Sequence, residues 1–105
     1  MGDAEGYPTE AELERIRTWD VRKEPLEDYL DYVRSCWWRP GWGWQQTEYS
    51  LRLSTGGWSG NESIIDAMRH NSRFWSLTWE TSRRGGHYHF VFGIGKVKHW
   101  VRRRD

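Results

Sequence analysis

The residues best suited to chemistry lie in the run 54–62, which reads Ser-Thr-Gly-Gly-Trp-Ser-Gly-Asn-Glu. This run follows an alternating, strand-like segment, 48–54, and leads into an apolar helical pattern that starts at Ile64. A glycine-rich loop between a strand and a helix gathers unpaired backbone N–H groups beside the positive end of the helix dipole. Trp58 adds a flat ring for stacking, and its small neighbours Gly57, Ser59 and Gly60 have too little side-chain bulk to cover that ring. We therefore expect a small anionic, nucleotide-like ligand at this loop.

Three further groups of residues could complete such a site. Arg52 precedes the loop, and Arg83 and Arg84 lie beside a glycine pair that predicts a hairpin turn. A guanidinium group can bind phosphate through two parallel hydrogen bonds. Tryptophans of the turn 42–44 could stack on a base. The predicted ligand-binding residues are Gly56, Gly57, Trp58, Ser59, Gly60, Asn61, Trp42, Trp44, Arg52, Arg83, Arg84 and His87.

The glycine-rich loop also has a purely structural interpretation. It lacks the Gly-Lys-Ser/Thr ending of a P-loop and the three-glycine spacing of a dinucleotide site. Residues 59–62 fit a capping box, in which Ser59 and Glu62 would satisfy the start of the helix internally. Glu62 would then repel an anion. On this interpretation the glycines serve only an ordinary turn.

Two histidines offer the chemistry of an enzyme or a metal site. His87 and His89 lie on one face of a predicted strand and could supply part of a zinc site. No third ligand is specified, and Glu80 or His70 would be arbitrary choices. The pair could do acid–base work with Glu80, but the sequence suggests no Ser-His-Asp or Cys-His set. We expect no metal, no cofactor and no catalytic residue, and therefore binding without catalysis.

Helical and strand-like patterns must position these residues. Thr9 and Glu12 form a capping box for a helix at 9–19, and an apolar stripe predicts a second helix from Pro25 to Trp37. The tryptophan-rich segment 37–44 contains proline and glycine, which predicts a turn without a regular element. The remaining elements are a strand at 48–54, a helix from 59 to about 71, a strand at 74–81, a hairpin turn at 83–86, a strand at 87–92 and a candidate strand at 97–102.

This order predicts an α+β fold of the type α-α-β-α-β-β, a small antiparallel sheet of three or four strands with helices packed on one face. The other face would be polar, which solvation alone could explain. Its predicted members are Ser50, Arg52, Ser54, Ser76, Thr78, Glu80, His87 and His89. The 105 residues fit a single domain, 1–105, with 1–8 and 102–105 expected to be flexible.

Composition restricts the partners and the compartment. Nine of the 17 aromatic residues are tryptophan, so we expect several at a pocket or at the interface of a homo-oligomer. Residues 1–32 contain ten acidic and four basic residues, and 33–105 contain five acidic and twelve basic ones. A nucleic-acid-binding protein is usually basic throughout, so nucleic acid is not an expected partner. The single cysteine, Cys36, falls in helical register and should be packed. Without a disulfide, a membrane-length apolar run or a signal-peptide core, the chain should be cytoplasmic.

The chain contains four distinctive runs in a fixed order, namely 54–62, 64–68 (Ile-Ile-Asp-Ala-Met), 74–75 (Phe-Trp) and 82–88 (Ser-Arg-Arg-Gly-Gly-His-Tyr). Together these runs resemble a group of small accessory proteins of tailed bacteriophages. The tryptophans at 37–38 and 42–44 are similar as well, and the likeness covers about residues 13–92. The resemblance implies a setting, the cytoplasm of the bacterial host, where such proteins often blunt host immunity.

Two functions compete within that setting. The first is sequestration of a nucleotide signal by ligand binding without catalysis. The second is inhibition of a host protein that is bound through a tryptophan-rich surface. An enzyme that acts on a nucleotide through the two histidines is a third alternative, and nucleic-acid binding by the basic C-terminal part is a fourth.

Overall fold

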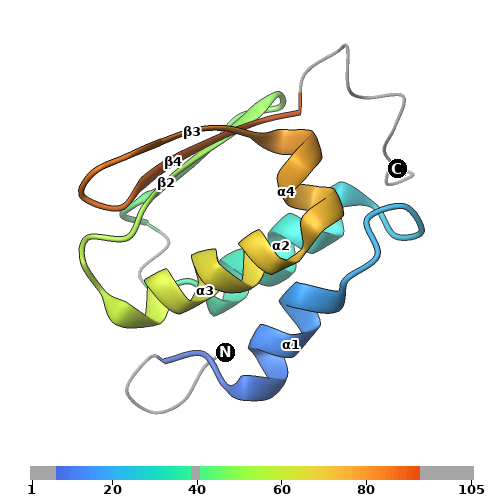
Figure 1. The fold of residues 1–105 in the computed structure, drawn as a ribbon, viewed down its shortest axis with the longest axis horizontal. Helices are drawn as coiled ribbons and strands as arrows, with labels where there is room; N and C mark the ends of the chain where they lie inside the picture. Colours follow the sequence, from blue (N-terminus) through green and yellow to red (C-terminus); the bar gives the residue numbers. More distant parts are fainter. Residues whose placement is uncertain (1–6, 39–40, 93–105) are drawn as a thin grey trace.

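The computed structural model describes residues 7–38 and 41–92 (Figure 1). Two helices, α1 (Glu10–Thr18) and α2 (Leu26–Cys36), precede the hairpin of β1 (Trp44–Gln46) and β2 (Ser50–Ser54). Two more, α3 (Ser59–His70) and α4 (Ser72–Thr78), precede the hairpin of β3 (Trp79–Arg83) and β4 (His87–Val91). The candidate strand 97–102 and the ends expected to be flexible, apart from residues 7 and 8, lie outside the described residues.

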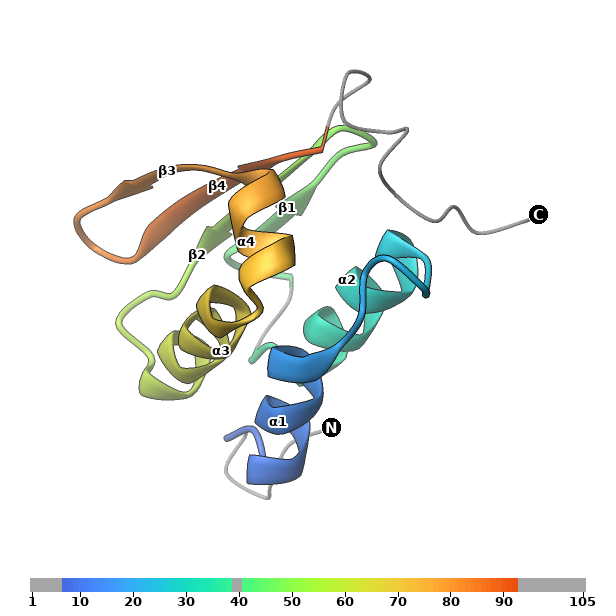
Figure 2. The same ribbon diagram turned by 45° about the vertical axis from the view of Figure 1, so that its right-hand side comes forward.

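The four strands form one antiparallel sheet in the order β1-β2-β4-β3, so β2 and β4 are central. The helices lie on one side of this sheet (Figures 1 and 2). This arrangement confirms the predicted fold class, a small α+β fold with helices on one face of an antiparallel sheet. Within the described ranges, no helix is both long and apolar enough to cross a membrane.

The two N-terminal helices form as their sequences predict. Glu12 N donates to Thr9 Oγ1 at 3.1 Å and Thr9 N donates to the Glu12 carboxylate at 2.8 Å, which completes the capping box of α1. The apolar stripe of α2 is buried and includes Cys36, which is 2% exposed. Burial, together with the nearby Glu12 carboxylate, raises the pKa of the Cys36 thiol to about 11.

The segment 74–81 is not the strand that its alternating pattern predicted, because residues 72–78 form α4. Asn71 accounts for the difference. Its side chain accepts a hydrogen bond from Phe74 N at 3.3 Å, which caps a new helix directly after α3. The same side chain donates to the carbonyls of Ile16 and Trp19 at 3.0 and 2.9 Å. The carbonyls of Ile16 and Trp19 are distant in sequence, so the local pattern could not reveal the contacts that hold Asn71 in its capping position.

The membership of the sheet differs from the prediction in two places. Ser76 and Thr78 belong to α4, and Thr78 is fully buried, so neither contributes to the outer face of the sheet. Conversely, the tryptophan-rich turn includes strand β1, in which Trp44 pairs with Leu53. Gly43 permits this pairing, because at a φ of 82° its carbonyl accepts a backbone N–H of β2 at 2.8 Å. The element order is therefore α-α-β-β-α-α-β-β.

The core lies between the sheet and the helices. The inner face of the sheet contributes Leu51, Leu53 and Phe90, each at most 1% exposed. The helices contribute Tyr29, Leu30, Val33, Ile64, Ile65, Met68 and Phe74. Because successive side chains of a strand point to opposite faces, the residues that alternate with Leu51 and Leu53 are presented on the outer face.

Candidate functional site

A patch of polar side chains covers the outer face of the sheet and lines an open depression there. We call it the outer-face site, and it consists of Gln45, Arg52, Ser54, Thr81, Arg83, His87 and His89. Strand register brings its members together from all four strands, since Arg52 of β2 is directly opposite His89 of β4, and Ser54 is opposite His87. The side chains of the site therefore project from hydrogen-bonded strands and not from a loop.

The outer-face site carries an excess of positive charge. Arg52 and Arg83 are permanently charged, and their guanidinium groups present fixed forks of N–H donors. No acidic residue is among the ten described residues that line the depression. The neighbouring hydroxyl, imidazole and amide groups can each donate or accept hydrogen bonds. Such a set suits an anion with several oxygen atoms.

One hydrogen bond within the site joins a hydroxyl to an imidazole. Ser54 Oγ lies 2.8 Å from His87 Nδ1, and either atom can be the donor. This contact fixes the ring of His87 next to Arg83 of the neighbouring strand. Among the described residues, no group of three or more histidine, cysteine or acidic side chains is placed to hold a metal ion. The site thus offers oriented hydrogen-bonding groups.

The two glycine pairs that the sequence singled out meet beside this site. Thr55 N donates to Gly86 O at 2.9 Å, which joins the loop after β2 to the turn between β3 and β4. Gly56, Gly57, Gly85 and Gly86 all have φ between 63° and 90°, which only glycine adopts readily. The contact is close, since a Cβ atom at Gly86 would lie 2.1 Å from Thr55 Oγ1. The predicted hairpin turn is confirmed, and the contact fixes its position.

The loop 54–62 differs from the predicted capping box. The N-cap of α3 is Trp58, without a side-chain hydrogen bond, and the helix begins at Ser59. Ser59 Oγ donates to the Tyr7 hydroxyl at 3.3 Å, and the Glu62 carboxylate accepts from Thr55 Oγ1 at 3.4 Å. The prediction failed because the tight turn closed by Trp58 N and Thr55 O starts the helix one residue earlier. A carboxylate next to the loop makes it a poor place for an anion.

The ring of Trp58 is half-buried and is stacked against two other aromatic rings. Its ring stacks on Tyr7 at a centroid distance of 4.7 Å and on Trp38 at 4.4 Å. The indole N–H is buried, and it makes no hydrogen bond within the described residues. The small neighbours of Trp58 suggested that its ring would be open to a ligand. They instead leave room for aromatic side chains from two distant segments.

The two predicted tryptophans of the turn 42–44 have opposite environments. Trp44 is only 9% exposed and packs edge-on against Trp37 at a centroid distance of 5.7 Å, so it belongs to the core. Trp42 is 57% exposed and rests on Gly56, where a Cβ atom would lie 2.6 Å from its ring. Trp42 is therefore the predicted stacking residue whose ring is accessible.

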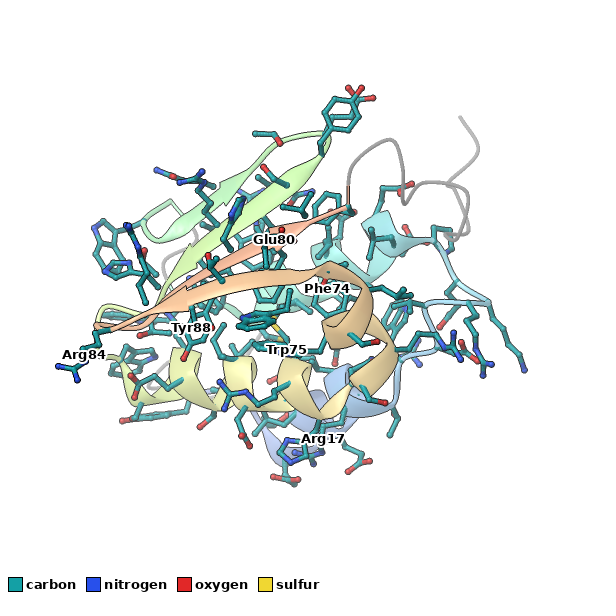
Figure 3. The ribbon with its side chains drawn as sticks, turned by 45° about the horizontal axis from the view of Figure 1, so that its top comes forward. Arg17, Phe74, Trp75, Glu80, Arg84 and Tyr88 are labelled. Atoms are coloured by element: carbon teal, nitrogen blue, oxygen red, sulfur yellow. The ribbon has the colours of Figure 1, made fainter. Side chains whose placement is uncertain are left out.

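Three other predicted residues are placed apart from the outer-face site. Asn61 is buried and binds the backbone of Trp38, accepting from its N–H at 2.9 Å and donating to its carbonyl at 3.3 Å. Gly60 is buried beneath the Trp58 ring. Arg84 projects from the tip of the β3–β4 hairpin, away from the sheet (Figure 3). Asn61 and Gly60 therefore have structural contacts, and Arg84 lies outside the outer-face site.

Of the twelve predicted ligand residues, Arg52, Arg83 and His87 therefore lie within the outer-face site. Ser54 and His89 were expected on the polar face but not as ligand residues. Gln45 and Thr81 were missed, because their place depends on strand β1 and on the end of α4. Comparison with protein-family models, with curated proteins and with solved structures finds no match to this chain.

Proposed function

We propose that the protein binds a small anionic, nucleotide-like ligand at the outer-face site and does not convert it chemically. The observation that carries this proposal is the register of the sheet, which aligns Arg52 with His89 and places His87 next to Arg83. These cationic and imidazole groups share one exposed depression whose described lining contains no acid. Phosphate oxygens would receive the guanidinium N–H donors in pairs.

Trp42 would supply the stacking surface for the base. Its exposed ring rests on Gly56, two residues beyond Ser54, and the adjacent Gly43 is hydrogen-bonded to β2. The ring is thus attached to the same end of the sheet as Ser54 and His87. By analogy with single-strand binders, a stacked base contributes about 1–3 kcal/mol. This placement replaces the earlier expectation that the base stacks on Trp58.

The biological setting of the proposal comes from the resemblance to accessory proteins of tailed bacteriophages. In the cytoplasm of an infected host, a protein that holds a nucleotide without converting it would remove that nucleotide from circulation. We therefore propose sequestration of a host immune signal as the anti-defence role of this protein. The proposal also includes a homo-oligomer, because exposed tryptophans are covered well by symmetric assembly.

A screen of cyclic and linear nucleotides tests this function. Thermal unfolding and tryptophan fluorescence of the wild-type protein should reveal at least one ligand that raises the melting temperature. Arg52→Gln should weaken its binding at least tenfold, because a charge-assisted hydrogen bond is lost. Arg73→Gln, which removes the same charge from exposed Arg73 on α4, should leave binding unchanged. The ligand released by heat should be chemically intact. Absence of any shift, or equal effects of the two variants, would refute the proposal.

A second candidate function is the binding of a host protein through exposed tryptophans. Trp42 is 57% exposed before β1, and Trp79 is 42% exposed on β3, so one lies at each edge of the sheet. Tryptophan is enriched among residues that dominate binding energy at protein interfaces. If this function holds, Trp79→Ala should abolish capture of a defined host protein, whereas Arg52→Gln should not. Light scattering on both variants would separate this loss from a change in oligomeric state.

A further inference from the structure

Strand β3 is an edge of the sheet, and all five of its residues are exposed (Figures 1 and 2). In the part of the chain that the structure describes, β3 has a neighbouring strand, β4, on one side only. An edge strand presents backbone N–H and C=O groups to which a further strand can bond. Trp79, at the start of β3, adds a ring that is 42% exposed. This edge therefore has the features of an interaction surface.

The hydrogen bonds of β4 show which backbone groups of β3 point to the open edge. Thr55 N donates to Gly86 O at 2.9 Å, and the register between β2 and β4 continues from there without a shift. The even-numbered residues of β4 therefore direct their backbone groups toward β2. Ser82 is opposite Tyr88, an even-numbered residue. The N–H and C=O of Ser82 consequently point away from β4, to the open edge.

The side chains of β3 select one register for pairing with a second copy. Thr81 and Arg83 lie on the outer face. Ser82 and Trp79 lie on the helix side, where Trp79 Nε1 donates to Ser82 Oγ at 2.7 Å. Residues directly opposite in paired strands share a face, and like charges there repel. A pair centred on Arg83 would oppose two guanidinium groups, and one centred on Thr81 would oppose Arg83 with Trp79 of the other face. A pair centred on Ser82 opposes Thr81 with Arg83, which share the outer face.

We propose that β3 pairs antiparallel with β3 of a second copy of this chain, with Ser82 at the two-fold axis, and that the outer-face site extends across this pairing. Ser82 N of each copy donates to Ser82 O of the other, which joins the two four-stranded sheets into one. Arg83 of each copy lies opposite Thr81 of the other and adds a guanidinium group to its site. The two Arg83 residues are diagonal neighbours, about 7–8 Å apart. A ligand with two phosphate groups can therefore bind both.

The helix side of the same edge supplies a second complementary contact. The ring of Trp79 is stacked on that of Trp75 at a centroid distance of 6.1 Å, and it remains partly exposed. Arg84 projects from the hairpin tip (Figure 3). In the register centred on Ser82, Arg84 of the second copy comes beside Trp79, where a guanidinium group makes a favourable cation–π contact. The two-fold axis produces this contact twice. The pairing depends on the edge strand alone, and the shared site rests on the proposed function.

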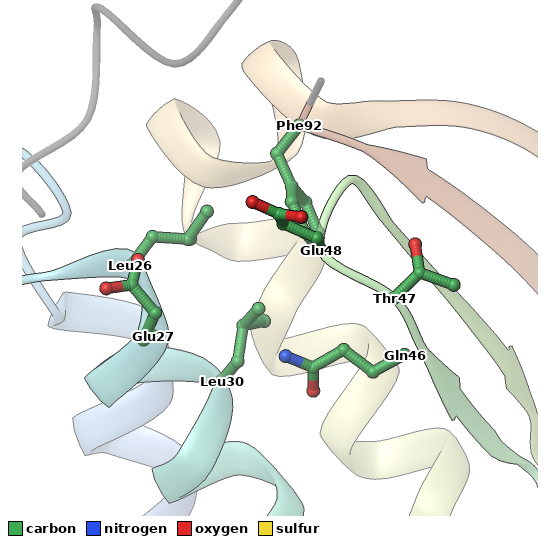
Figure 4. A pocket seen from close by; sticks show the side chains of 7 residues that line it. All are labelled: Leu26, Glu27, Leu30, Gln46, Thr47, Glu48 and Phe92. Carbon is green, nitrogen blue, oxygen red and sulfur yellow. The ribbon is translucent and has the colours of Figure 1, made fainter. Parts of the chain in front are cut away.

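Disulfide trapping tests the pairing without any ligand. Opposite residues that exchange both hydrogen bonds have Cα atoms about 5.5 Å apart, a distance that a disulfide spans. Ser82→Cys should therefore form a covalent dimer under mild oxidation, and native Cys36, which is 2% exposed, should not take part. The matched control is Gln46→Cys on β1, the other edge of the sheet, where Gln46 lines a pocket beside α2 (Figure 4). Equal trapping of the two variants, or none with Ser82→Cys, would overturn the proposal.

Analytical ultracentrifugation of the full-length protein measures the non-covalent dimer. Ser82→Pro should be monomeric, because it removes the N–H donor of both central bonds. It should also stay folded, because proline is tolerated where its nitrogen faces an open edge. Arg84→Gln should weaken dimerisation about fivefold to thirtyfold, since two cation–π contacts are lost. Arg34→Gln, an exposed position on α2 beside β1, should have no effect. A wild-type protein that stays monomeric, as it would if its own residues 93–105 occupied this edge, overturns the proposal.

Calorimetric titration with inorganic pyrophosphate tests the shared site. The Ser82→Cys covalent dimer should bind it at least about fivefold more tightly than the Ser82→Pro monomer, because each site of the dimer gains a guanidinium group. Arg83→Gln in the covalent dimer should abolish this difference. Equal affinities of dimer and monomer would overturn the shared site and leave the proposed function standing. If neither form binds pyrophosphate or any nucleotide, the shared site and the proposed function both fail, and trapping still decides the pairing by itself.

Discussion

The contact between the two glycine-rich turns can be tested by adding one methyl group. In Gly86→Ala the new Cβ atom would lie 2.1 Å from Thr55 Oγ1 and 3.2 Å from Thr55 Cβ. The φ of 78° at this position adds a second penalty, because a left-handed conformation costs an alanine about 1–2 kcal/mol. Forcing a methyl group into a packed contact costs about 1–3 kcal/mol more. We therefore expect Gly86→Ala to reduce the free energy of unfolding by about 2–5 kcal/mol.

Gly57→Ala is the matched control for this variant. Gly57 has nearly the same φ, 76°, but no atom lies within 4 Å of a Cβ atom built there. Its substitution should cost only the conformational part, about 1–2 kcal/mol. Urea unfolding followed by tryptophan fluorescence gives both values by linear extrapolation. The difference between the free energies of unfolding of the two variants measures the cost of the steric contact between a methyl group at position 86 and Thr55.

A double-mutant cycle isolates the contact itself. Thr55→Ala removes Oγ1, the atom nearest to the new methyl group, so Gly86→Ala should cost at least about 1 kcal/mol less in that background. Gly86→Ala should also weaken binding of the proposed ligand, because it displaces the turn that places His87 next to Ser54. Equal destabilisation by Gly86→Ala and Gly57→Ala, together with a cycle that shows no coupling, would refute the reasoning.

Three further predictions concern the core and the aromatic stack. Asn71→Ala should lower the free energy of unfolding by about 3 kcal/mol, because it removes a helix cap and leaves two buried carbonyls without their donor. Asn71→Asp keeps the acceptor of the cap but not the N–H donor, so it should be nearly as destabilised in the same urea assay. Native Cys36 should resist iodoacetamide at pH 8 and react once urea unfolds the protein, and stability should fall as pH rises from 9 toward 11, where the unfolded thiol ionises before the native one. Trp58→Ala should lower the free energy of unfolding by about 3 kcal/mol because the stacked rings are lost, yet leave the affinity for the proposed nucleotide-like ligand unchanged in fluorescence titration of the folded protein. A weaker affinity would show that Trp58 contributes to the proposed binding site.

The sequence was sufficient where local rules decide the structure. The capping box of Thr9 and Glu12 and the apolar stripe of α2 correctly predicted the first two helices. Local rules failed at α4, because the alternation of Trp75, Leu77 and Trp79 is also compatible with a short helix. The choice there depends on Asn71, whose acceptors are 52 and 55 residues away. Strand β1 was not predicted either, because a strand of three residues is too short to show an alternating pattern.

The candidate site was predictable only in part for the same physical reason. Arg52 and His87 stand out by residue type and by their place beside a loop or turn. Gln45 and Thr81 have no distinguishing pattern, and only the pairing of four strands brings them to the site. The prediction that the Trp58 ring is open to a ligand is wrong, because small neighbours in the sequence do not by themselves leave a ring exposed. They equally allow Tyr7 and Trp38 to approach, and these rings stack against that of Trp58.

The candidate site lies on the sheet and not in the glycine-rich loop, so the glycines of that loop have a different role from the one predicted. Backbone amides of a glycine-rich loop would have bound the anion directly, but Glu62 accepts from Thr55 there and opposes a negative charge. The glycines instead allow the two turns to touch, as the hydrogen bond from Thr55 N to Gly86 O shows. That contact anchors one end of β4, and with it the cross-strand pair of Ser54 and His87. Groups held by paired strands keep a more precise geometry than groups on a loop. The proposed ligand should therefore be bound by side chains of the sheet, and the contact between the two turns should keep those side chains in register.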